Sequence, residues 1–107
     1  MSSNVKLVIF VPVTHADLIR KTLGDMGIGK KGDYDHCSFS IKGIGRFRSN
    51  ENADPSVGEP GKYEEVDEEK IEFLVERSRV KEAIEKAKHV HPYEEPVFEV
   101  IALEELE

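Results

Sequence analysis

The sequence predicts an α+β fold in which a four-stranded antiparallel sheet carries two helices on one of its faces. Apolar residues alternate along four segments and recur at helical spacing along two others, and the order of these segments is β-α-β-β-α-β. Right-handed crossovers in the two β-α-β halves place the first and third strands in the centre of a ferredoxin-like sandwich. A chain of 107 residues is long enough for one such domain, residues 1–107, and too short for two.

The first strand and the first helix have the clearest signals. Residues 5–11 are apolar on both faces, and Pro12 should end this strand because proline cannot donate to a central ladder. Thr14 occupies the expected N-cap of the helix that follows, with Asp17 as an acidic residue of its first turn. The helix should end before Gly27. Its apolar face is formed by Leu18, Ile19, Leu23 and Met26.

Residues 34–47 and 63–77 predict the second and third strands. Gly43 and Gly45, near the end of the second strand, indicate a bend, a bulge or a close backbone approach, and a bulge is the preferred interpretation. The polar loop at 48–62 is longer than a simple connection requires, which favours a mobile or ligand-binding loop.

A second helix and a last strand complete the pattern. Ser78 should cap the helix, and residues 97–103 should form the strand. The apolar positions of the helix follow the i, i+3, i+4, i+7 pattern and are Val80, Ala83, Ile84, Ala87 and Val90. The sheet face that carries no helix would expose Val8, Phe10, Ile101 and Leu103. Because apolar sheet surface usually meets another subunit, we expect a homo-oligomer.

Composition and charge exclude several classes of protein. The formal net charge of −7 argues against nucleic acid or an anionic membrane as a partner, since both require a basic face. No segment approaches the roughly 18–20 apolar residues of a membrane span, and residues 1–4 do not resemble the start of a signal peptide. The single cysteine, Cys37, excludes an internal disulfide and is expected on the apolar face of the second strand, where it would be inert. A cytoplasmic protein is expected.

The most distinctive segment is 89–96, His-Val-His-Pro-Tyr-Glu-Glu-Pro, which joins the second helix to the last strand. Its two prolines hold the backbone extended. We expect this segment to line a ligand-binding cleft at a subunit boundary, through His91, Tyr93, Glu94 and Glu95. Lys62 of the long loop would contact an anionic part of the ligand.

Two interpretations of the histidines are open. An extended backbone would place His89 and His91 on one face, where together with Glu95 they would suit zinc or a similar divalent ion. Alternatively, His91 orients the turn through a backbone hydrogen bond, Tyr93 packs at a subunit boundary, and a glutamate pairs with a basic residue of a neighbour. Two histidines without a third strong ligand are a weak zinc signal, and His36 would help only if it approached this segment.

Several motifs occur in an order that resembles the YqfO-type domain, which is inserted in the middle of the dimetal-binding NIF-three-like proteins. These motifs are Gly32–Phe39, Gly43–Phe47, Ala53–Gly58, Glu64–Val66 and His91–Pro96. The chain departs from that pattern at Ser49 and Asn52, where the insert usually has proline and glycine. The His-Pro-Tyr-Glu-x-Pro motif also resembles that of the CutA cation-tolerance proteins.

These resemblances imply a fold of the PII/CutA-like type, and a trimer, because CutA and PII proteins are trimers. The match is to the insert alone, so a hydrolase activity of the metal-binding halves is not expected here. The sequence therefore favours a non-enzymatic, oligomeric binding or regulatory module that takes a small ligand or a divalent metal ion. A metal-assisted hydrolase using His89, His91 and a glutamate is one alternative. A structural partner of a separate dimetal-binding protein is another.

Overall fold

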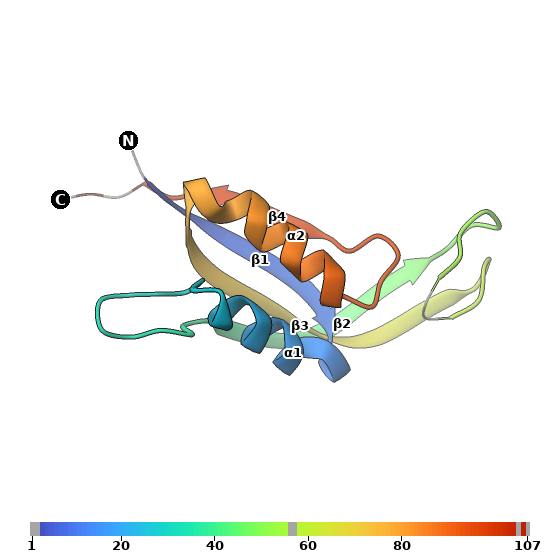
Figure 1. The fold of residues 1–107 in the computed structure, drawn as a ribbon. Coiled ribbons are helices and arrows are strands. Elements are labelled where there is room, and N and C mark those ends of the chain that lie inside the picture. The colour runs from blue at the N-terminus through green and yellow to red at the C-terminus, as the bar shows by residue number, and fades with distance from the viewer. Residues whose placement is uncertain (1–2, 56–57, 105, 107) are drawn as a thin grey trace.

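The computed structural model describes residues 3–55, 58–104 and 106 of the chain. Its elements are β1 (Asn4–Pro12), α1 (Val13–Asp25), β2 (Phe39–Arg48), β3 (Tyr63–Glu76), a 3₁₀ turn η1 (Arg77–Arg79), α2 (Val80–Val90) and β4 (Phe98–Ala102). The strands form one antiparallel sheet in the order β2-β3-β1-β4. Both helices lie against the same face of this sheet (Figure 1). The predicted α+β, ferredoxin-like fold with the first and third strands in the centre is therefore confirmed.

The hydrophobic core lies between the helices and the central strands. Every second residue of β1 points into it, as the alternation of side chains along a strand requires. Its fully buried members in the elements come from β1, β3 and the two helices, and include Leu7, Ile9, Ile19, Leu23, Ile71, Ala83 and Ala87. The two alanines of α2 are fully buried on the side of that helix that faces the core. The predicted apolar stripe of the second helix is thus confirmed.

Strands β2 and β3 extend beyond the rest of the sheet. β1 pairs with β3 only from Glu68 to Glu76, whereas β2 continues to pair with β3 as far as Tyr63. The outer part of this pair is a two-stranded ribbon that protrudes from the molecule and carries the long loop (Figure 1). The ribbon places the loop beside the segment between α2 and β4, and this arrangement creates the candidate site.

Both predicted helix caps are wrong. α1 begins at Val13, directly after Pro12, which is still paired in the sheet, so Thr14 lies inside the helix and Asp17 lies beyond its first turn. Ser78 lies within η1, and Arg79 occupies the position before α2. In both places the chain passes from strand into helix with almost no connecting residues. The residues at the two N-cap positions are therefore Pro12 and Arg79, and neither forms a side-chain capping hydrogen bond.

The second strand begins at Phe39 and not at residue 34. Residues 31–38 form a loop that folds back on the end of α1, with the Cys37 amide donating to the carbonyl of Gly29 at 2.9 Å. Cys37 therefore precedes the strand, half-buried, and does not lie on its apolar face as expected. A side chain at Gly29 would collide with the Cys37 carbonyl, so this close approach requires glycine.

The sheet face without helices differs in part from the expectation. Val8 is fully buried, although it is flanked on this face by Glu72 and Glu99 and not by a helix. Glu72 bridges Lys6 and Lys70 at 3.5 and 3.6 Å, so that long charged side chains lie across the centre of the face. The exposed apolar residues lie nearer its edges and are Phe39, Ile41 and Ile101, at 64%, 49% and 45% exposure.

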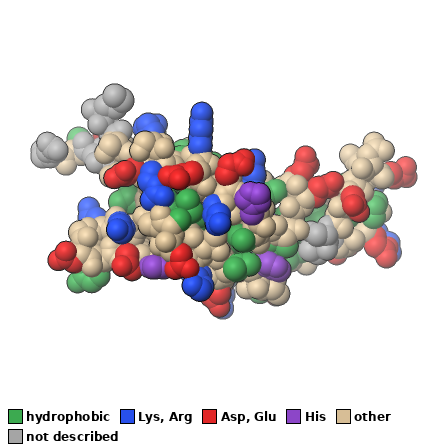
Figure 2. All heavy atoms as spheres, in the orientation of Figure 1, with side chains coloured by type: hydrophobic (Ala, Val, Ile, Leu, Met, Phe, Trp, Pro, Cys, Tyr) green, Lys and Arg blue, Asp and Glu red, His purple; other side chains and the backbone are tan. Residues whose placement is uncertain are grey.

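The helix face is polar and of mixed charge. Figure 2 shows Lys and Arg side chains interspersed with Asp and Glu over this side of the molecule, without a continuous basic area. Neither of the two helices in the described part of the chain is long and apolar enough to cross a membrane.

Candidate functional site

His91 fixes the start of the segment between α2 and β4. Its backbone amide closes the last turn of α2 on the Ala87 carbonyl. Its buried ring donates from Nε2 to the Phe10 carbonyl at 2.7 Å and accepts at Nδ1 from the Tyr93 amide at 3.1 Å. Burial of the ring lowers the pKa of His91 below its usual value of 6.5. A neutral His91 with the proton on Nε2 therefore holds the segment against the end of β1, on the edge that β4 leaves unpaired.

Tyr93 carries the polar centre of the site. Its hydroxyl donates to Oε2 of Glu68 on β3 at 2.5 Å. Its ring meets the Phe47 ring edge-on, with centroids 6.1 Å apart, and lies 5.0 Å from the His91 ring. Burial, followed by the bond to Glu68, raises the pKa of Tyr93 well above 10.0. Tyr93 thus stays a neutral donor that orients the Glu68 carboxylate.

Gly45 makes room for that carboxylate. A Cβ atom at this position would overlap the carboxylate group of Glu68, whereas one at Gly43, two residues earlier on the same face, would meet nothing within 4 Å. The pairing of β2 with β3 runs without interruption from Phe39 to Arg48. The preferred interpretation of these glycines, a bulge, is therefore wrong, and at Gly45 the close approach of another group is the reason for glycine.

These residues surround a pocket of about 450 Å³ at the base of the protruding ribbon. Phe10, Phe47, Glu68, Tyr93, Glu94 and Glu95 line it, together with Val97, Gly45 and residues of β2 and of the loop between 46 and 55. The loop is tied to the segment by the Asp54 amide, which donates to Glu94 at 3.2 Å. The pocket is therefore closed by parts of the chain that are about forty residues apart in sequence.

The structure brings together only some of the predicted site residues. Tyr93, Glu94 and Glu95 line the pocket, and His91 supports it from behind without lining it. Lys62 lies outside the pocket, where its Nζ pairs with Glu59 at 2.6 Å.

The expected metal ligands are also separated. The backbone is still helical at His89, which is exposed on α2, whereas His91 is buried and uses both ring nitrogens in hydrogen bonds. Within residues 3–55, 58–104 and 106, no group of three or more His, Cys, Asp or Glu side chains is arranged to hold a metal ion.

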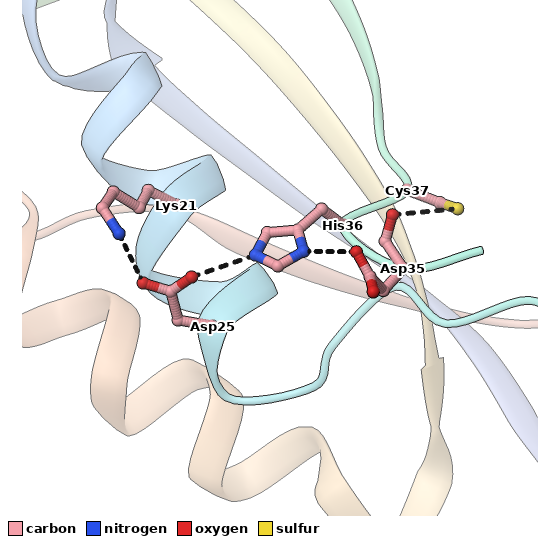
Figure 3. A network of polar contacts seen from close by, with 5 residues as sticks. All are labelled: Lys21, Asp25, Asp35, His36 and Cys37. Atoms are coloured by element: carbon pink, nitrogen blue, oxygen red, sulfur yellow. Dashed lines mark hydrogen bonds and ion pairs between the residues drawn. The ribbon is translucent and has the colours of Figure 1, made fainter. Parts of the chain in front are cut away.

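His36 belongs to a second polar cluster at the end of α1 (Figure 3). Its two ring nitrogens donate to Asp25 at 3.0 Å and to Asp35 at 2.7 Å, while Lys21 pairs with Asp25 at 2.7 Å. The bonds to Asp25 and then Asp35 raise the pKa of His36 above 6.5. The ring packs against Gly24, where a Cβ atom would overlap it, and the backbone of His36 is left-handed. This cluster fastens the loop at 31–38 to the helix.

Sequence reasoning missed Phe47 and Glu68, which complete the pocket. Both lie in strands whose pattern predicts only structure, and the Gly43–Phe47 motif, which contains Phe47, carries a family resemblance but no chemical role. The one available signal was Gly45, since a glycine within a strand marks either a bulge or a close approach.

Comparison with known proteins gives the relatives of this chain. It is 41% identical over 98 residues to a protein of Halalkalibacterium halodurans named GTP cyclohydrolase 1 type 2 homolog, covering 92% of this chain and 26% of that protein. A homolog of the same name from Bacillus subtilis is 37% identical over 100 residues, covering 94% and 27%. The chain is homologous to the insert region of these NIF3-type proteins. It spans about a quarter of the length of the curated relatives that it matches. No protein-family model matches the chain.

Solved structures agree with this assignment of the NIF3-type insert. A Bacillus cereus protein related to NIF3 superposes with a TM-score of 0.79 at 39% identity, over 95% of this chain and 25% of that one. CutA from Archaeoglobus fulgidus superposes with a TM-score of 0.69 at 18% identity, over 95% of this chain and 85% of that one. GlnK from B. subtilis superposes with a TM-score of 0.52 at 18% identity, over 94% of this chain and 87% of that one. The last two likenesses show the fold alone, and the resemblance to the insert is confirmed.

Proposed function

We propose that this chain is a non-enzymatic binding module that takes a small ligand in the pocket beneath residues 93–95. The observation that carries this proposal is the pocket itself, in which Tyr93, Glu94 and Glu95 meet Phe47 and Glu68. A concave site of about 450 Å³ with aromatic walls and a few oriented polar groups has the size and character of small-molecule sites.

The polar groups around the pocket support binding over catalysis. His91 is neutral and engaged at both ring nitrogens, so it serves to position the segment and not to transfer protons. The Tyr93 hydroxyl is held by Glu68 and has a raised pKa, which makes it a hydrogen-bond donor and a poor base or nucleophile.

We also propose that the module is a homo-oligomer that associates through the sheet face opposite the helices. Phe39, Ile41 and Ile101 are exposed there and would be covered by a second copy of the chain. The resemblance to CutA and PII proteins favours a trimer. The pocket would then lie close to a subunit boundary, since Phe47 continues the row of Phe39 and Ile41 along β2.

A ligand screen tests the binding site. The ¹⁵N-labelled chain is mixed with a panel of metabolites and divalent metal salts, and the amide signals of Phe47, Tyr93 and Glu94 are followed by NMR. Saturable shifts that Tyr93→Ala abolishes and Tyr34→Ala preserves would support the site, because Tyr34 is exposed outside the pocket. Shifts that persist in Tyr93→Ala would contradict it.

Analytical ultracentrifugation tests the oligomer. We expect a single species larger than the monomer at micromolar concentration, and dissociation in Ile41→Glu, which places a charge on the exposed apolar face. Val100→Glu is the control, since Val100 is similarly exposed but lies on the helix side of the edge strand β4. A monomeric wild-type chain would refute the proposed assembly.

A further inference from the structure

Three carboxylates of the pocket have no Lys, Arg or His ion-pair partner among the residues that the structure describes. Glu68 accepts from the Tyr93 hydroxyl, and Glu94 accepts from the Asp54 amide. Within the described residues, the carboxylates of Glu68, Glu94 and Glu95 form no ion pair. Elsewhere in the molecule, carboxylates such as Glu65, Glu69 and Glu72 are paired with Lys or Arg. The pocket thus concentrates uncompensated negative charge.

The two arginines near the pocket do not neutralise this charge. Arg46 donates from Nε to Glu65 at 2.8 Å, and the Arg48 guanidinium carbon lies 5.9 Å from the centre of the Tyr63 ring. Both alternate with Phe47 along β2, so their side chains leave the strand on the opposite face. Both residues line the pocket as members of β2, while their side chains contact Glu65 and Tyr63.

Aromatic rings form the remaining walls. Phe10, Phe47 and Tyr93 line the pocket together with Val97. Ring faces attract cations through their quadrupole, and they shield a bound charge from water. Inorganic metal ions prefer several oxygen or nitrogen donors at short range, an arrangement that the described residues do not offer here.

We propose that the pocket binds a small organic cation, with its ammonium or guanidinium group against Glu68 and Glu95 and its alkyl part on Phe47 and Tyr93. This inference rests on the proposed function, because it names the class of ligand for the same site. Gly45 contributes by allowing the Glu68 carboxylate to lie over β2, where Tyr93 orients it. Glu94 is less available, since it holds the loop through Asp54.

A pair of probes of equal shape tests the charge requirement. Choline and its neutral isostere 3,3-dimethylbutan-1-ol are each titrated into the intact ¹⁵N-labelled chain, and the amide signals of Phe47, Tyr93 and Glu94 are followed. We expect saturable shifts with choline and about thirtyfold weaker binding of the alcohol, as two lost charge contacts of roughly 1 kcal/mol each would produce. Equal affinity for both probes would overturn the proposal.

Substitutions locate the charge. Glu68→Gln and Glu95→Gln should each weaken choline binding about fivefold, the factor that corresponds to roughly 1 kcal/mol. Both keep the shape of the side chain, and glutamine at 68 still accepts from Tyr93. Glu99→Gln makes the same change of net charge on β4, outside the pocket, and should have no effect. Equal effects of the three substitutions would show a nonspecific response to net charge and would overturn the proposal.

The outcomes separate this proposal from the proposed function. If choline causes no shift while another compound of the panel shifts the same three amides, the pocket binds ligands but the cation class is wrong. If no compound shifts them, both proposals fail. A basic side chain of a second copy offers the same chemistry. Absence of choline binding, with Glu68→Gln and Glu95→Gln dissociating the oligomer, would assign the pocket to that side chain and refute a free cation.

Discussion

Two glycine substitutions in the same strand isolate the contact that shapes the pocket. Gly43 and Gly45 lie on the same face of β2, and neither has a positive φ, so alanine is compatible with the backbone at both positions. Alanine in place of glycine within a strand is expected to stabilise the fold by about 0.5–1 kcal/mol. Gly43→Ala should show this gain in full, because its methyl group enters open space.

Gly45→Ala should have the opposite effect. Its methyl group overlaps the end of the Glu68 side chain, which is flexible and will move aside, so the cost is the bond from Tyr93 and not a rigid clash. A hydrogen bond to a charged group contributes about 1.5–3 kcal/mol, and the partial exposure of Glu68 favours the low end. After the glycine gain is subtracted, Gly45→Ala should be destabilised by roughly 0.5–1 kcal/mol.

The difference between the two variants, about 1.5 kcal/mol, therefore measures the contact between Tyr93 and Glu68, because the backbone terms cancel. Urea unfolding followed by far-ultraviolet circular dichroism gives each free energy of unfolding. In a Tyr93→Phe background the difference should vanish, since the bond is already absent. Equal stability of Gly43→Ala and Gly45→Ala in the wild-type background would refute the role of Gly45 in making room for the Glu68 carboxylate.

Three further outcomes are expected from the histidines. His91→Ala leaves the Phe10 carbonyl and the Tyr93 amide without their His91 partners in a partly buried position, and should lower the free energy of unfolding in urea by about 1–3 kcal/mol; a loss below about 0.5 kcal/mol would contradict the anchoring role. Because its folded pKa is lowered, His91 should reduce stability as the pH falls below 6.5 towards that pKa, and His91→Gln should remove this slope in thermal unfolding. His36 has a pKa that is raised in the folded state. Its contribution to folding stability is therefore complete below pH 6.5 and is lost as the pH rises through the pKa of the folded state. His36→Gln should remove the pH dependence of thermal unfolding above pH 6.5 and leave the slope below pH 6.5 that is due to His91. A wild-type thermal stability that is constant between pH 6 and 8 would contradict the assignments of both histidines.

The fold was predictable because its signals are local and mutually consistent. Burial of one face of β1 produces an alternation of buried residues along the strand, and burial of one face of α2 produces the spacing of Ala83 and Ala87. Both patterns can be read in the sequence itself. The cap of α1 was mispredicted because Pro12 is both the last residue of β1 and the N-cap residue of α1. No connecting residue lies between the two elements, so Thr14 is already inside the helix. No local pattern encodes the length of a connection.

The site was only half predictable, for a related reason. The 89–96 segment is distinctive because it combines two histidines, two prolines, a tyrosine and two glutamates, but its chemistry depends on the residues that it contacts. An extended backbone was predicted at His89, whereas α2 continues to Val90, so His89 is exposed on the helix and His91 is buried just beyond its end. Glu68 and Phe47 are ordinary strand residues, and their role follows from the ribbon that extends beyond β1.

The same geometry explains why the pocket and the fold are coupled. The segment after α2 occupies the edge of β1 that β4 leaves unpaired, and it is held there by the Nε2 proton of a buried His91. Tyr93 then reaches Glu68 on β3, and Glu94 reaches the loop at Asp54. A ligand that draws Glu68 or Glu94 towards its own charge would therefore compete with the contacts that hold the ribbon and the loop against the sheet. Occupancy of the pocket should for that reason alter the position of the loop more than that of the core, in which no pocket residue is a fully buried member.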